Sequence, residues 1–191
     1  MTRNVFSLLI FLSALSSCKE NYTPKPMGHI RIEPPEAKYM TFNKDELPYL
    51  FSVSLWTIIE MPPLGNIATW MNIDYTNYNA KIFCSYQPIT PNTLDEHFEE
   101  CRRLFESSVK KANAISEKVF ENKENNVYGT LFLIEGETAS PVQFILTDSI
   151  SHFFRGALYY DKIYNPDSIA PVTEYIKKDI MELVQTFHWK N

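Results

Sequence analysis

Residues 143–160 read QFILTDSISHFFRGALYY, two apolar runs separated by a short polar segment. The first run ends at Thr147, and the second run, which is rich in aromatic side chains, begins at His152. Apolar runs of this length, separated by Asp and Ser, are typical of β-strands joined by a turn. The segment therefore predicts two strands joined by a tight turn, in which Asp148 accepts hydrogen bonds from the backbone amides that follow it.

The polar residues of this segment also suggest a chemical alternative. A serine nucleophile needs a histidine base and an orienting carboxylate, and Ser149 or Ser151 would take the first role with His152 and Asp148. On one continuous strand, however, Asp148 and His152 would stand about 13 Å apart, at roughly 3.3 Å per residue. The chain also lacks a G-x-S-x-G elbow and a glycine-rich phosphate loop. We therefore expect no enzymatic activity, with a Ser/His/Asp hydrolase as the lesser alternative.

Two other residues of the segment are unusual in a strand. His152 is expected to be a structural donor beside the aromatic side chains. Arg155 lies within FFRGAL, where a charge needs a carboxylate partner or an outward-facing position. An ion pair and a binding contact are both open for Arg155. Asp148, His152 and Arg155 are therefore candidates for structural or partner contacts.

The pattern of strands followed by a helix occurs twice along the chain. Runs of β-branched and aromatic residues predict strands over residues 49–60, 69–89 and 127–135. Apolar residues at steps of three or four predict long helices over residues 94–119 and 169–187. Together these elements predict an α+β fold, an antiparallel sheet of about six strands in two meanders packed with two long helices. By fold analogy alone, without a shared motif, this arrangement resembles PsbP-like domains.

The start of the chain has the composition of an export signal followed by a tether. Residues 1–17 contain one positive charge, an apolar run too short to span a bilayer, and small residues, as in a secretory signal peptide. The sequence LSSC ends at Cys18 and resembles a bacterial lipobox, which predicts acylation of that cysteine, with palmitate among the acyl chains. An ordinary secreted protein is the alternative. Residues 18–48 are Pro-rich and predict a tether, and residues 49–191 predict a single globular domain.

Composition argues against several other classes of protein. The net charge is −5 and no basic run occurs, so the chain has no electrostatic footprint for nucleic acid. No zinc-ligand spacing or cofactor motif occurs, because the four histidines are far apart in the sequence. Cys84 and Cys101 are either two buried thiols or one disulfide, and the sequence leaves both open.

The aromatic content of 14% has three interpretations. We favour a core built on aromatic packing over a partner interface formed by exposed Tyr and Trp. The third interpretation is an envelope small-ligand-binding module. It would require a concave site of roughly 300 Å³ or more with converging polar groups.

Several segments together carry a family resemblance. They are KENYTPKP after Cys18, TWMNIDY (69–75), KIFCSY (81–86), VYGTLFLIEGETASPVQFILTDSISHFFRGALYY (127–160) and NPDSIAPVTEYIKKDI (165–180). These segments resemble the gliding-motility-associated lipoprotein GldD family over essentially the whole chain. The resemblance implies a non-enzymatic cell-envelope lipoprotein of Bacteroidota, an accessory component of gliding motility and type IX secretion that needs no cofactor.

The resemblance also implies a location and partners. The protein would be anchored to the outer membrane through lipid on Cys18, the one functional residue that carries over from the family. Its other partners would be motility and secretion lipoproteins. Lys19-Glu20-Asn21 matches a surface-export signal only in part, which favours the periplasmic face.

Overall fold

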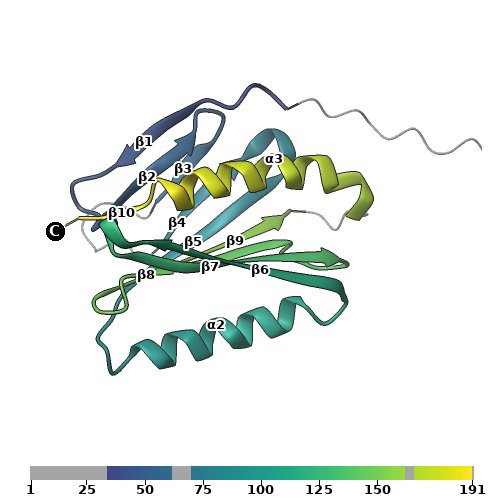
Figure 1. The fold of residues 1–191 in the computed structure, drawn as a ribbon. Coiled ribbons are helices and arrows are strands. Elements are labelled where there is room, and N and C mark those ends of the chain that lie inside the picture. Colours follow the sequence, from purple (N-terminus) through teal and green to yellow (C-terminus); the bar gives the residue numbers. More distant parts are fainter. Residues whose placement is uncertain (1–33, 62–69, 162–165, 191) are drawn as a thin grey trace, which may run out of the picture. The chain divides into compact units, whose positions relative to one another are not determined.

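The computed structural model describes residues 34–61, 70–161 and 166–190, which form two antiparallel sheets and two helices. The larger sheet has seven strands in the order β3-β4-β5-β9-β8-β7-β6 (Figure 1). Within this sheet, the pairing of β5 with β9 joins the first three strands in sequence, β3 to β5, to the last four, β6 to β9. The strands are β3 (Ile58–Glu60), β4 (Trp70–Tyr75), β5 (Ala80–Pro88), β6 (Ala112–Asn122), β7 (Val127–Gly136), β8 (Val142–Thr147) and β9 (His152–Tyr160).

The α+β fold with an antiparallel sheet and two helices is confirmed. The strands predicted around the 148–151 turn are present as β8 and β9, and the region predicted as strand over residues 69–89 is interrupted by the short 3-10 helix η1 (Thr76–Tyr78). The number of strands differs from the predicted six, because the larger sheet has seven strands and a second sheet has three.

The second sheet has β2 (Tyr49–Ser54) at its centre, between β1 (Tyr39–Asn43) and β10 (His188–Trp189). β1 precedes residue 49, where the sequence predicted the globular domain to begin. Phe42 and Leu47, before that boundary, are 5% and 1% exposed. The folded region therefore begins earlier than predicted, because the prolines that suggested a tether flank β1 rather than interrupt it.

The helices α2 (Leu94–Ser108) and α3 (Pro166–Gln185) lie on opposite faces of the larger sheet (Figure 1). Ile176 and Ile180 of α3 join the main core, whereas Phe98 of α2 packs edge-on against Phe153 on the other face. Neither of these helices is long and apolar enough to cross a membrane.

The prediction that the first helix continues to residue 119 is wrong. The helix ends at Ser108, and residues 112–122 form the edge strand β6, which pairs with β7. Ile115 and Val119, four residues apart, share a face in a strand as well as in a helix. They are 45% and 84% exposed, so the apolar stripe that suggested a longer helix is not buried.

The main core lies between α3, the smaller sheet and one face of the larger sheet, and it is rich in aromatic rings. Tyr49, Phe51, Phe154 and Phe187 are fully buried. The ring centroid of Phe154 lies 5.0 Å from that of Tyr49, in an edge-on arrangement, and 5.2 Å from that of Phe187, in a tilted one. Aromatic pairs prefer such arrangements to a face-to-face sandwich. The prediction of an aromatic core is confirmed.

Candidate functional site

The turn between β8 and β9 is organised by one carboxylate. The Oδ1 atom of Asp148 accepts hydrogen bonds from the backbone amides of Ile150, Ser151 and His152 at 2.9, 2.8 and 2.8 Å. Ser149 has a φ of 64°, in the left-handed region that side chains other than Asn and Asp rarely adopt. Burial, the largest single influence, raises the pKa of Asp148, but the three amide donors together outweigh burial and hold that pKa below its ordinary value. The Asp148 carboxylate therefore stabilises the turn.

The His152 ring belongs to the main core side of the sheet. Its Nδ1 atom lies 2.9 Å from the hydroxyl of Tyr86, within hydrogen-bond distance. The ring also stacks on Trp189 of β10, with centroids 4.9 Å apart and planes 16° from parallel. His152 thus links β9 to the end of the chain.

These residues do not assemble a hydrolase triad. The contact of Asp148 with His152 is to the backbone amide rather than to the ring. Within the described part of the chain, the hydroxyls of Ser149 and Ser151 form no hydrogen bond with the His152 ring, whose Nδ1 atom is taken by Tyr86. The turn therefore gathers the residue types of a triad without the geometry that the chemistry needs.

Arg155 lies on the opposite face of β9 from His152, because alternate residues of a strand point to opposite faces. Its Nη2 atom donates a hydrogen bond of 2.9 Å to the Oε1 atom of Gln143, across the β8–β9 pair. The structure therefore gives Arg155 a neutral amide where an ion pair was one expectation. No carboxylate among the described residues forms an ion pair with Arg155.

Gln143 is the residue that sequence reasoning missed. It is 3% exposed, and within the described chain its Nε2 atom has no hydrogen-bond partner. A buried amide donor left unpaired is unfavourable by roughly 1–3 kcal/mol. The only sequence signal was a long polar side chain within the apolar run PVQFILT.

Arg155 and Gln143 open into a cavity of about 370 Å³ between α2 and the larger sheet. Its walls are largely aromatic, and the rings of Phe105 on α2 and Phe132 on β7 lie 4.8 Å apart. Cys101 and Ser108 are the buried residues of the 15-residue helix α2, so the helix stands off from the sheet. The side chains around the cavity include Phe98, Phe105, Phe132, Gln143, Ile145 and Arg155.

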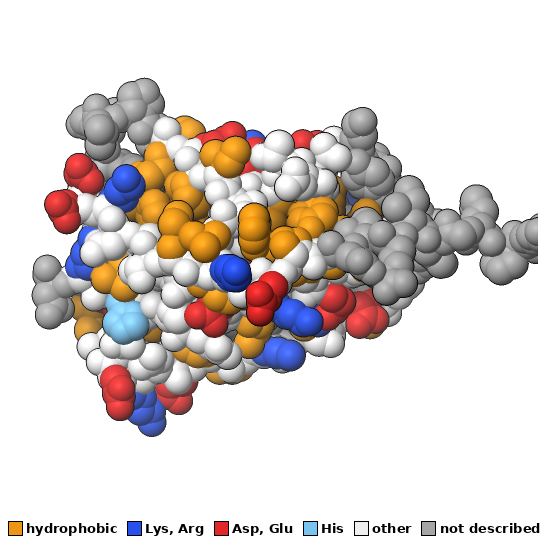
Figure 2. Space-filling view, turned by 90° about the horizontal axis from the view of Figure 1, so that it is seen from above, with side chains coloured by type: hydrophobic (Ala, Val, Ile, Leu, Met, Phe, Trp, Pro, Cys, Tyr) orange, Lys and Arg blue, Asp and Glu red, His pale blue; other side chains and the backbone are white. Residues whose placement is uncertain are grey.

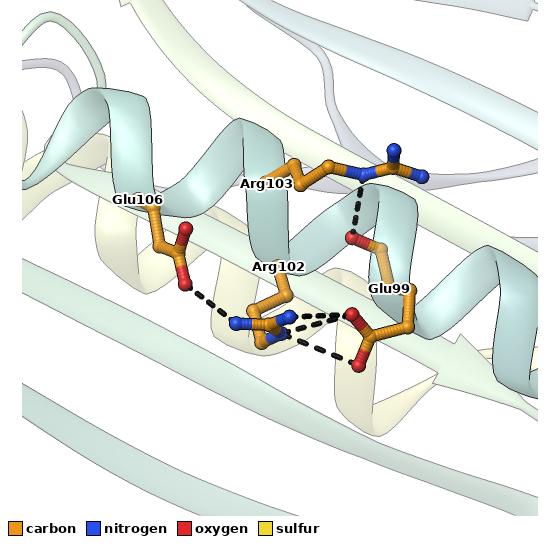
Figure 3. A network of polar contacts seen from close by, with 4 residues as sticks. All are labelled: Glu99, Arg102, Arg103 and Glu106. Carbon is orange, nitrogen blue, oxygen red and sulfur yellow. Dashed lines mark hydrogen bonds and ion pairs between the residues drawn. The ribbon is translucent and has the colours of Figure 1, made fainter.

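Two charged side chains that line the cavity, Glu99 and Arg102, are paired with each other (Figure 3). Arg102 binds Glu99 through its Nε and Nη2 atoms and Glu106 through its Nη1 atom at 2.7 Å. These three side chains are 56–59% exposed, and exposed ion pairs of this kind contribute little to stability. A second hollow, on the outer side of α2, is open and lined mainly by charged side chains such as Glu96 and Arg103.

The two cysteines of the described chain are free thiols. Cys84 is on β5 in the main core, and Cys101 is on α2 on the other side of the sheet. Burial raises the pKa of both thiols, that of Cys101 to about 11, and the nearby Arg155 guanidinium opposes the shift in each. The disulfide alternative is therefore not realised in this structure.

A second polar cluster, also missed from sequence, lies within the main core. Asp179 of α3 is 4% exposed and accepts hydrogen bonds from the hydroxyls of Tyr39 and Tyr75 at 2.9 and 3.0 Å. Burial raises the pKa of this carboxyl, and the hydrogen bonds from its partners act in the opposite direction. Its position on the apolar stripe of α3, next to Ile180, was the signal that could have found it. We assign it to fold stability, because it lines no cavity described above.

The described residues contain no group of three or more His, Cys, Asp or Glu side chains arranged to hold a metal ion. The features above define a two-sheet α+β domain with a ligand-sized cavity under α2, in whose described residues Asp148, His152 and the two turn serines do not assemble a catalytic triad. The chain belongs to the gliding motility lipoprotein GldD family, whose model matches residues 19–189. Membership makes it a membrane-anchored lipoprotein of the cell envelope in the setting of gliding motility, and the family is one of accessory lipoproteins rather than a known enzyme family.

Two other comparisons were made. No curated protein matches the chain. Among solved structures, the chain is similar to the solution structure of cyanobacterial PsbP (CyanoP) from Synechocystis, with 10% sequence identity and a TM-score of 0.47. That similarity covers 87% of this chain and 98% of the cyanobacterial chain.

Proposed function

We propose that this chain is a non-enzymatic accessory component of the gliding machinery, anchored to the outer membrane by acyl chains on Cys18 and facing the periplasm. The family match, which begins at residue 19, carries the proposal. Cys18 lies outside the described residues, and the LSSC sequence that ends there supports its lipidation. In this proposal residues 1–17 are removed as a signal peptide, and the Pro-rich segment before β1 spaces the domain from the membrane.

We further propose that it acts with the type IX secretion apparatus by binding other envelope lipoproteins. Exposed apolar side chains support such contacts. Ile58, Trp70 and Phe83, on β3, β4 and β5, are 60%, 43% and 45% exposed. The strand register places all three on the sheet face opposite the main core. Exposed aromatic residues gain most from burial in a partner interface.

On the side of the molecule that carries α3, which is seen from above the view of Figure 1, side chains of both charges are mixed. Figure 2 shows one face of the molecule, where hydrophobic side chains gather in a band and Lys, Arg, Asp and Glu side chains are interspersed. A face without a block of one charge offers little steering of a charged partner.

Genetics tests the proposal directly. Deletion of the gene should abolish colony spreading and reduce secretion of type IX cargo. A Cys18→Ser variant expressed at the same level should behave like the deletion and fractionate away from the outer membrane. A Cys101→Ser variant serves as the matched cysteine control, and cells that express it should spread and secrete type IX cargo normally. Normal spreading and secretion in the deletion strain would overturn the proposal.

Crosslinking tests the partner contacts. A photoreactive amino acid at Trp70 or Phe83 should capture another envelope lipoprotein in living cells. The same residue at Glu100, exposed on the outer side of α2, should capture much less. Equal capture from all three positions would argue against the apolar surface as the interface.

A further inference from the structure

The cavity under α2 has the chemistry of a ligand site, and this inference does not depend on the proposed function. Arg155 and Gln143 both line it. Both side chains have hydrogen-bond donors, and the one contact between them uses the Oε1 atom of Gln143, which leaves the Nε2 donor unpaired. A group that satisfied both donors would have to be an acceptor, and the positive charge of Arg155 favours an anion.

The amide orientation of Gln143 is fixed by its neighbour. Because Arg155 is only a donor, it requires the oxygen of the Gln143 amide on its side. The Nε2 atom is therefore the group left unpaired, in a residue that is only 3% exposed. Water can satisfy such a donor, but a carboxylate oxygen satisfies it and the neighbouring charge together.

The remainder of the cavity is apolar. Phe105, Phe132 and Ile145 contribute walls, and Phe98, 41% exposed, lies at the α2 side. The volume of about 370 Å³ falls within the range of small-molecule sites. Because α2 buries little of its own surface, an apolar group between the helix and the sheet would gain burial that neither element supplies.

The other charged side chains that line the cavity do not provide a second free cation, besides Arg155, for an anionic ligand. Arg102 is held by Glu99 and Glu106. Glu117, on the exposed edge strand β6, also lines the cavity and disfavours ligands with several negative charges. A single negative charge with an apolar tail fits this arrangement better than a phosphate or a dicarboxylate.

We propose that the cavity between α2 and the larger sheet binds an amphipathic monocarboxylate of the fatty-acid type, its carboxylate between Arg155 and Gln143 and its chain against Phe105 and Phe132. The carboxylate would accept hydrogen bonds from the Arg155 guanidinium and the Gln143 Nε2 atom, while the existing bond between the two side chains is kept.

The test uses the full-length lipoprotein in nanodiscs and decanoate that carries a diazirine at the end of its chain. After irradiation, labelled peptides are mapped by mass spectrometry. The carboxylate probe should label α2 and β7, near Phe105 and Phe132, and unlabelled decanoate should compete. The corresponding alcohol, with the same chain and no charge, should label these peptides about tenfold less, the loss expected for a charge-assisted hydrogen bond.

Two variants separate binding from folding. Gln143→Glu supplies Arg155 with an internal carboxylate and replaces the free donor by a repelling charge, so labelling should fall about tenfold while the thermal midpoint is kept or raised. Arg155→Met removes the charge and should lower labelling similarly. Arg103→Met, on the outer side of α2, is the matched arginine control and should label as the unchanged protein does. If Arg155→Met fails to fold, Gln143→Glu carries the test.

Equal labelling by the acid and the alcohol, or labelling that survives in Gln143→Glu, would overturn the proposal, because the probe would then be partitioning into apolar surface. A photoreactive peptide with a free C-terminal carboxylate could also label the same cavity. If decanoate failed to reduce that labelling, the proposal would be overturned in favour of a peptide site.

Discussion

The Asp148 carboxylate meets His152 at its backbone amide and not at its ring. The Oδ1 atom of Asp148 accepts a hydrogen bond of 2.8 Å from the His152 amide, while the His152 ring lies against Tyr86 and Trp189. In a hydrolase the Asp148 carboxylate would orient the His152 ring. Here the carboxylate closes the turn, and the ring packs against Trp189 near the end of the chain. The relationship makes both residues contributors to stability.

Replacing the carboxylate of the turn should destabilise the fold. Asp148→Ala removes the acceptor of three backbone amides, and we expect the free energy of unfolding to fall by about 1–3 kcal/mol. Because the pKa of Asp148 is lowered in the folded protein, its contribution is present above the ordinary pKa of 3.8 and is lost as pH falls through the lowered value. Urea unfolding at pH 7 and pH 3 measures both effects. Asp148→Asn, which keeps one acceptor oxygen, should lose less, and a larger loss for Asn than for Ala would contradict this account.

The His152 ring should matter for stability and not for chemistry. His152→Ala removes the stacking on Trp189 and the contact with Tyr86, and we expect a loss of about 0.5–1.5 kcal/mol. Cells that express the variant at the normal level should spread normally. Ser151→Ala should change neither stability nor spreading. Loss of spreading by either variant at unchanged protein level would revive the hydrolase hypothesis.

The buried carboxyl of Asp179 should give the protein a characteristic pH dependence. Because its folded-state pKa is raised, the folded state binds more protons than the unfolded state between the ordinary pKa of 3.8 and the raised value. The free energy of unfolding should therefore decrease as pH rises through this interval. Asp179→Asn should flatten the dependence, as measured by urea unfolding at several pH values. Asp161→Asn, an exposed position, is the control, and an unchanged slope for Asp179→Asn would refute the assignment.

Gly156 should tolerate no larger side chain. A Cβ atom at this position would lie 2.2 Å from the ring of Phe144 on the neighbouring strand. We expect Gly156→Ala to destabilise the protein by about 1–3 kcal/mol through overpacking. Combining it with Phe144→Leu should recover part of that loss, since the smaller side chain leaves room for the methyl group. A double variant that is less stable than the sum of the two single changes would show that the clash lies elsewhere.

Neither thiol of the folded domain should react with alkylating reagents. Cys84 and Cys101 are buried, and the pKa of Cys101 is raised to about 11 by burial, so little thiolate is present near neutral pH. Iodoacetamide should modify both thiols after denaturation without any reductant, as read from the intact mass. If reductant were required, the two cysteines would be bridged.

How far the sequence predicts this structure depends on how local each feature is. The β8–β9 hairpin was predictable because two apolar runs flank turn residues within a few positions. The end of α2 was not, because Ile115 and Val119 fit both periodicities and only the pairing of β6 with β7 decides between them. Arg155 was recognised as unusual, but its partner Gln143 lies on another strand, and a register is not encoded in a local pattern. The cavity was unpredictable for the same reason, since its walls come from α2, β6, β7, β8 and β9.

The strand order also dictates when the fold can form. β9 is the strand that joins β3, β4 and β5 to β6, β7 and β8, and β10 completes the smaller sheet from the very end of the chain. In a polypeptide that crosses a membrane from its N-terminus, the two halves of the larger sheet therefore cannot pair until the last segments have crossed. Until then the apolar faces of the early strands stay uncovered, and such non-local pairing is slow and exposed to aggregation. A chain that stopped before residue 152 would contain both halves of the larger sheet and lack the strand that unites them.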